Sequence, residues 1–256
     1  MTTLKTVAKR LPSPLQRALR TARIIVRRQC RPLYRPLARW TARGGLALTR
    51  YLLALPGNYS ALYGVTRSAR ASHDRETETR WAMIAPHLPS SGFALDLGCH
   101  NGWFTFSLGD AGLHALGVER EDSLVRASQW LTLHNQSDRT AFVCLDLTPD
   151  TVHQLPSADV VLCLSVFHHW VRFNDLAYAE RIMRGIANRC RRQLFFDTGQ
   201  PNEPQPWAGA LSFMGTSPQV WLVDFLTSLG FSDVVHLGDS PGFGGKSFRH
   251  LMMATR

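Results

Sequence analysis

The sequence predicts an α/β protein: a seven-stranded, mostly parallel sheet with helices on both faces, preceded by a basic helical N-terminal arm. Three observations support this fold class. Short apolar segments alternate with helical patterns over residues 74–256. A glycine turn joins the first strand to a helix, as in nucleotide-binding βαβ units. All acidic residues follow residue 73, which separates a basic arm at 1–73 from a mildly acidic domain at 74–256.

The glycine turn lies in the most informative part of the chain. Residues 94–97 form a short apolar strand, and a helix is expected from Trp103 to Gly109. Between them, Gly98 and Gly102 permit a sharp backbone turn against a ligand at the N-terminus of the helix. This arrangement predicts half of a nucleotide-binding βαβ unit.

An acidic residue distinguishes this turn from the dinucleotide fingerprint. Asp96 lies two residues before the first glycine, and a second strand at 113–118 ends at Glu119. A carboxylate repels a pyrophosphate but attracts an ammonium group, and an acid after the second strand suits ribose hydroxyls. We therefore expect a nucleoside ligand that carries a cationic group.

The rest of the domain continues the alternation. The segment 159–164 is almost entirely apolar, as expected for a central parallel strand buried on both faces. Ser217 and Pro218 give a start signal for a late helix. Further helices are predicted at 74–88, 123–134 and 218–230, and further strands at 140–145, 159–164, 193–196, 232–237 and 250–255. The total is seven strands, of which the last is expected to be antiparallel.

The order of the motifs LDLGCHNG, GVE, CLDL and LCLSVFHHW resembles the class I S-adenosylmethionine-dependent methyltransferases over residues 74–256. The resemblance implies a Rossmann-like sheet of order 3-2-1-4-5-7-6 and S-adenosyl-L-methionine as cofactor. It assigns Asp146 to the adenine amino group and Leu147 to the adenine ring. The implied cofactor-binding residues are Asp96, Gly98, Cys99, Gly102, Glu119, Asp146, Leu147 and Ser165.

Methyl transfer from a sulfonium is an in-line displacement, so alignment of the acceptor supplies most of the catalysis. A hydroxyl acceptor needs a base, and His168 or His169 follows the fourth strand at the carboxyl edge of the sheet. We favour His168. The alternative is that one histidine packs under the cofactor and the other caps a backbone carbonyl; a carboxylate acceptor would need no base.

Two segments are candidates for the acceptor site. The first is the proline-rich stretch 201–215, and the second is 238–249, whose glycines suggest a mobile flap. The candidate substrate residues are Trp170, Trp207, Phe213, Lys246 and Arg249. We find no serine–histidine–aspartate triad motif and no metal-ligand cluster in the sequence. Five widely spaced cysteines without CxxC pairs indicate reduced thiols that are not metal ligands.

The arm contains 15 lysines and arginines and no acidic residue, whereas the whole chain carries a net charge of +10. Ser13, Pro14 and Pro32 predict an amphipathic helix at 13–31. Such a helix could lie on an anionic membrane surface, bind RNA phosphates, or pack against the catalytic domain; an organellar transit peptide is a minor alternative. No apolar run reaches about 18 residues. We expect a cytoplasmic protein that binds the inner membrane surface.

The acceptor is suggested by a narrower resemblance. SVFHHWVRFND, followed by a strand and DTGQPNEPQPW, is similar to the methyltransferase half of the kinase-methyltransferases that cap O-antigen chains, and to related enzymes of polysaccharide biosynthesis. By position this likeness carries over Ser165, His168 and His169. It implies O-methylation of a glycan, a lipid-linked saccharide or another small hydroxyl acceptor. The alternatives are an RNA methyltransferase and a non-catalytic, cofactor-binding tethering module.

Overall fold

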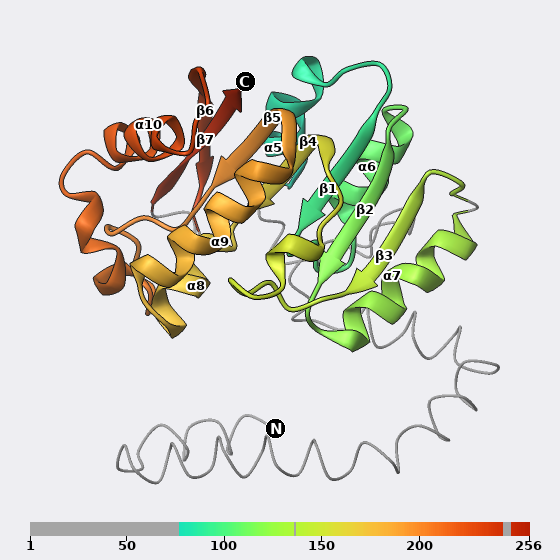
Figure 1. Ribbon diagram of the computed structural model, residues 1–256, viewed down its shortest axis with the longest axis horizontal. Helices are drawn as coiled ribbons and strands as arrows, with labels where there is room; N and C mark the ends of the chain where they lie inside the picture. Colours follow the sequence, from blue (N-terminus) through green and yellow to red (C-terminus); the bar gives the residue numbers. More distant parts are fainter. Residues whose placement is uncertain (1–76, 136, 243–246) are drawn as a thin grey trace, which may run out of the picture. The chain divides into compact units, whose positions relative to one another are not determined.

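The computed structural model describes residues 77–135, 137–242 and 247–256. They form a seven-stranded sheet of order β3-β2-β1-β4-β5-β7-β6 (Figure 1). The strands are β1 (Phe93–Leu97), β2 (His114–Glu119), β3 (Thr140–Cys144), β4 (Ala158–Leu164), β5 (Cys190–Asp197), β6 (Asp233–Pro241) and β7 (Phe248–Thr255). Strand β7 runs opposite to the other six strands and pairs antiparallel with both β5 and β6. The predicted order and the antiparallel last strand are confirmed.

Helices cover both faces of the sheet (Figure 1). They are α5 (Thr77–Ile84), α6 (Trp103–Asp110), α7 (Asp122–His134), α8 (Phe167–Phe173), α9 (Leu176–Arg189) and α10 (Pro218–Ser228), with short 3₁₀ helices η1 (Ala85–His87), η2 (Val152–Gln154) and η3 (Ala208–Met214). Apolar residues of α8, α9 and α10 pack on one face, and those of α5 and α6 pack on the other. Helix α7 extends the second layer through Phe106 and Phe142.

The alternation of side chains along each strand explains this two-sided core. In β4, Val161 and Cys163 belong to the cluster with α9, whereas Val160 and Leu162 belong to the cluster with α5 and α6. All four side chains are fully buried. A strand that is buried on both faces must be apolar throughout, which is why the run 159–164 identified it in the sequence.

The structure corrects the predicted flap at 238–249. Strand β6 continues to Pro241 and β7 begins at Phe248, and the two strands pair as far as Pro241 opposite Phe248. Helices α8 and α9 were not predicted. Arm residues 1–73 and the predicted helix at 13–31 lie outside the described residues, as does Lys246. Within the described ranges, no helix is both long and apolar enough to cross a membrane.

Candidate active site

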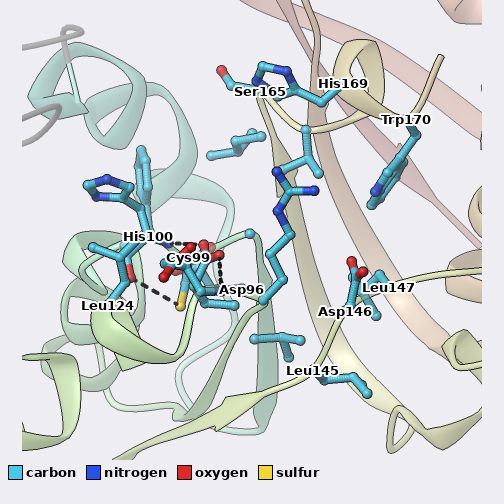
Figure 2. Close-up of a pocket in the computed structure, with 18 of the residues that line it drawn as sticks. Asp96, Cys99, His100, Leu124, Leu145, Asp146, Leu147, Ser165, His169 and Trp170 are labelled. Carbon is cyan, nitrogen blue, oxygen red and sulfur yellow. Dashed lines mark hydrogen bonds between the residues drawn. The ribbon is translucent and has the colours of Figure 1, made fainter. Parts of the chain in front are cut away.

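A cavity of about 820 Å³ opens at the carboxyl ends of β1, β2 and β4. This volume is within the roughly 300–1,000 Å³ typical of small-molecule sites, and the edge of the sheet is where open α/β folds bind ligands. Figure 2 shows Asp96 and Cys99 on one side, Asp146 and Leu147 opposite them, and Ser165 and His169 beyond. Residues of helices α5, α6, α7, α8 and α9, together with Gln205 and Trp207, also line the cavity.

The turn after β1 has the backbone conformation that its glycines suggested. Gly98 has φ +71° and Gly102 has φ +82°, both in the left-handed region. His100, between them, also has a positive φ of 52°, which the sequence did not indicate. A Cβ atom on Gly102 would lie 2.5 Å from the Phe142 ring. Both this close contact and the positive φ therefore exclude a side chain at Gly102. Gly102 lies at the start of α6 but does not line the cavity.

Asp96 is buried and accepts a hydrogen bond of 2.7 Å from the Thr105 hydroxyl. Burial raises the pKa of its carboxyl from 3.8 to about 6, although the hydrogen bond from Thr105 opposes this shift. A cationic ligand group in the cavity would reverse the shift by favouring the ionised form. Burial also raises the pKa of the Cys99 thiol well above its usual range, so Cys99 is a neutral packing residue.

Glu119 is held by backbone N–H groups. Its Oε2 accepts from His100 at 3.1 Å and its Oε1 accepts from Glu121 at 2.9 Å. A carboxylate has about four acceptor positions, so two remain for a ribose diol. Asp146 and Leu147 follow β3 and line the same cavity. The three carboxylates Asp96, Glu119 and Asp146 therefore fit a ligand with an ammonium group, a diol and an exocyclic amine.

The two predicted histidines lie in different environments. His169 lines the cavity, whereas His168 is fully buried and does not. His168 Nδ1 accepts a hydrogen bond of 2.9 Å from Gly199 N–H, and its ring packs 4.5 Å from that of Trp207. The structure argues against the choice of His168, because that residue is buried in the core, and His169 is the histidine that lines the cavity.

Ser165 joins the cavity to a buried ionic network. It has a strained φ of +59°, and its backbone N–H donates to Asp197 Oδ1 at 2.7 Å. Its hydroxyl also donates to Asp197 and accepts from Arg80 and Arg249. Burial opposes ionisation of Asp197, but the two guanidinium charges outweigh it and lower the pKa of that carboxyl. Ser165 is thus held in place as a wall residue.

Arg249 belongs to this network and not to an acceptor flap. Its side chain is 4% exposed, and its guanidinium forms a two-point ion pair of 2.7 Å with Glu203. Among the other proposed substrate residues, Trp170 and Trp207 line the cavity, whereas Phe213 packs on the core. The sequence did not reveal Arg80 or Glu203, because no motif marks either residue. Further wall residues that it missed are Trp103, Phe104, Phe173, Tyr178 and Gln205.

Residues 95–193 match the family model of a methyltransferase domain. This stretch of the chain is therefore similar to a methyltransferase domain. This match, together with the fold, supports a class I S-adenosylmethionine-dependent methyltransferase, and it supports the predicted cofactor.

Solved structures show the same fold. The bifunctional kinase-methyltransferase WbdD has a TM-score of 0.62 at 19% identity, over 80% of this chain and 45% of WbdD. A second WbdD structure, at 2.2 Å resolution, gives 0.63 at 18%, over 80% and 46%. Magnesium protoporphyrin IX methyltransferase (ChlM) from Synechocystis PCC 6803 with bound SAM gives 0.56 at 18%, over 82% and 96%. This chain thus spans less than half the length of WbdD. No curated protein sequence matches it.

Proposed function

We propose that this chain is an S-adenosylmethionine-dependent methyltransferase that O-methylates a glycan or lipid-linked saccharide at the inner membrane surface. The observation that carries the cofactor assignment is the arrangement of Asp96, Glu119 and Asp146 around one cavity of about 820 Å³. When bound, S-adenosylmethionine supplies an electrophilic methyl group. The residues of the chain would hold the cofactor and align an acceptor oxygen with that group.

His169 is our candidate for the general base. It lies on the cavity wall beside Trp170 and Phe173, where it could take the proton of an acceptor hydroxyl. The aromatic rings around it offer flat apolar surfaces that suit the faces of a sugar ring and exclude water. The resemblance of SVFHHW to the O-antigen-capping enzymes and the structural likeness to WbdD favour a saccharide acceptor.

Cofactor binding is the first test. We expect calorimetry to detect binding of S-adenosylhomocysteine, and Glu119→Ala to weaken it by about tenfold or more, because a diol bound by a carboxylate is worth about 1.5–3 kcal/mol. Asp138→Ala is the matched control, since Asp138 is exposed and does not line the cavity. Equal weakening by both substitutions, or no binding by folded wild-type protein, would reject the assignment and favour a tethering module.

The acceptor is tested separately, by S-adenosylhomocysteine release with saccharide, lipid-linked saccharide and RNA acceptors. Saccharide-dependent release would support the proposal. Release that requires RNA instead, with an affinity that falls steeply with salt, would support the RNA methyltransferase alternative.

A further inference from the structure

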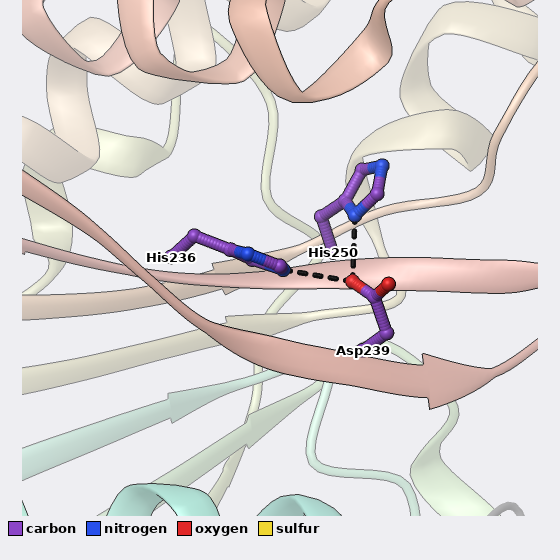
Figure 3. Close-up of side chains that lie close together, drawn as sticks. All are labelled: His236, Asp239 and His250. Atoms are coloured by element: carbon purple, nitrogen blue, oxygen red, sulfur yellow. Dashed lines mark hydrogen bonds and ion pairs between the residues drawn. The ribbon is translucent and has the colours of Figure 1, made fainter.

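The hairpin of β6 and β7 brings together three side chains that no motif connects: His236, Asp239 and His250 (Figure 3). His236 Nε2 and His250 Nδ1 each lie 2.7 Å from the same oxygen, Asp239 Oδ1. One ligand atom from each residue lies within 4.8 Å of the other two. None of the three residues lines the cofactor cavity, so this cluster is separate from the methyltransferase site.

A strand irregularity creates the cluster. In a regular strand, residues three apart point to opposite faces, so His236 and Asp239 would be separated by the sheet. The pairing of β6 with β7 shifts between His236 and Gly238: His236 lies opposite Met252, but Gly238 lies opposite Leu251. Such a bulge reverses the alternation, and Asp239 then lies opposite His250 on the face that His236 also uses.

We propose that His236, Asp239 and His250 form a binding site for a divalent transition-metal ion of the zinc type. Two imidazole nitrogens and one carboxylate oxygen are ligands that Zn²⁺ prefers, with a fourth position left for water. The side chains are 27%, 41% and 21% exposed, so an ion can enter from solvent. Ligand atoms around a tetrahedral Zn²⁺ lie about 3.3 Å apart. Each histidine nitrogen therefore needs to move roughly half an ångström farther from Asp239 Oδ1 when the ion binds.

The ion would replace two hydrogen bonds with three coordinate bonds and join two antiparallel strands. Strand β7 also carries Arg249, which borders His250 and anchors the network at Ser165. We therefore assign the site a stabilising role for the hairpin, and not a role in methyl transfer.

Zinc binding by the metal-depleted protein, residues 1–256, tests the proposal. Competition with a chromophoric chelator measures the affinity. We expect one tightly bound equivalent, with affinity lowered about tenfold or more by Asp239→Asn and by His236→Ala. His153→Ala is the matched control, because that histidine is exposed and outside the cluster, and it should bind like wild type. Each variant should keep wild-type affinity for S-adenosylhomocysteine, which shows that it is folded.

Two further readouts identify the ligands. Zinc should raise the Tm of wild-type protein but not that of Asp239→Asn, because only the former binds the ion tightly. Bound Co²⁺ should show ligand-field absorption without a thiolate charge-transfer band. Wild-type affinity in both cluster variants, a thiolate band, or no zinc binding by folded wild-type protein would each overturn the proposal.

Discussion

At the scale of single residues, the cavity contains a carboxyl group, that of Asp96, whose burial lowers the stability of the folded protein. Asp96 is buried at the end of β1, where its pKa rises to about 6. Thr105 donates a hydrogen bond to one carboxyl oxygen of Asp96. The positive charge of Arg80 lowers the pKa of Asp96 only weakly, so burial dominates. Polar groups that cost stability and line a ligand site are a common feature of binding sites.

Because the pKa of Asp96 differs between the folded and unfolded chain, the free energy of unfolding depends on pH in a defined direction. In the unfolded chain Asp96 ionises near 3.8, but in the folded chain it keeps its proton up to about pH 6. Its contribution to stability is therefore fully present below pH 4 and is lost as pH rises to 6, by about 3 kcal/mol. Asp96→Asn should remove this loss, so the variant gains stability relative to wild type between pH 4 and pH 7.

Urea unfolding at several pH values measures this gain. Asp138→Asn, at an exposed position, should show no such change relative to wild type. A constant difference between Asp96→Asn and wild type from pH 4 to pH 7 would contradict the assignment of the raised pKa. S-adenosylhomocysteine should bind more tightly as pH rises through 6, because its ammonium group interacts favourably with the ionised carboxylate of Asp96.

At the scale of elements, helix α8 decides which histidine faces the cavity. Ser165 turns the chain out of β4, and α8 begins two residues later. Successive helical residues point about 100° apart. His169, Trp170 and Phe173 line the cavity, whereas His168 packs under Trp207.

Substitution of each histidine should separate these roles. His168→Ala removes a buried ring and leaves the N–H of Gly199 without its acceptor, so it should lower the free energy of unfolding by about 2–4 kcal/mol. His169→Ala should cost less than about 1 kcal/mol. Urea unfolding measures both, and S-adenosylhomocysteine affinity should survive in His169→Ala. Similar losses in the two variants would contradict the division of roles.

The sequence predicted the strands, and it predicted that Asp96 and Glu119 lie at one edge of the sheet, because both depend on local signals. Strand β4 is a continuous apolar run, and the acids Asp96 and Glu119 follow from their places at strand ends. The other side of the cavity depends on contacts between distant residues. Helix α8 was missed because a serine, and not a glycine, takes the positive φ that starts it. Arg249 was assigned to a flap because its partner Glu203 lies 46 residues away.

At the scale of the whole molecule, a buried network connects strands β4, β5 and β7 with helix α5. Asp197 at the end of β5 pairs with Arg80 of α5, and Ser165 after β4 links this pair to Arg249 of β7. Removal of one charged member leaves its partner buried without an opposite charge. This lowers the free energy of unfolding by much more than the intact pair contributes to it. The network thus holds Ser165 in its place on the cavity wall.

The arm differs from the domain in charge, and this difference predicts where the protein binds. Residues 1–73 contain 15 basic residues and no acidic residue, whereas residues 74–256 contain 14 basic and 19 acidic residues. Basic residues near an anionic bilayer contribute about 1 kcal/mol each. We expect binding to anionic but not neutral vesicles, weakening as salt rises, and a loss of at least about tenfold on neutralising five arginines of the arm. The substituted residues, each changed to Gln, are Arg17, Arg20, Arg27, Arg28 and Arg31.

The control for this prediction removes the same charge from the domain. Five exposed arginines are changed to Gln, namely Arg126, Arg139, Arg181, Arg184 and Arg192. If net charge alone attracts the protein to vesicles, both variants lose binding equally, whereas a specific role for the arm affects the first variant only. Vesicle sedimentation measures both. Wild-type protein that binds RNA but no vesicle would contradict the membrane proposal. An arginine-rich segment attracts either polyanion, but only a lipid surface also accommodates the apolar face of the predicted helix, which contains Leu15, Leu19 and Val26.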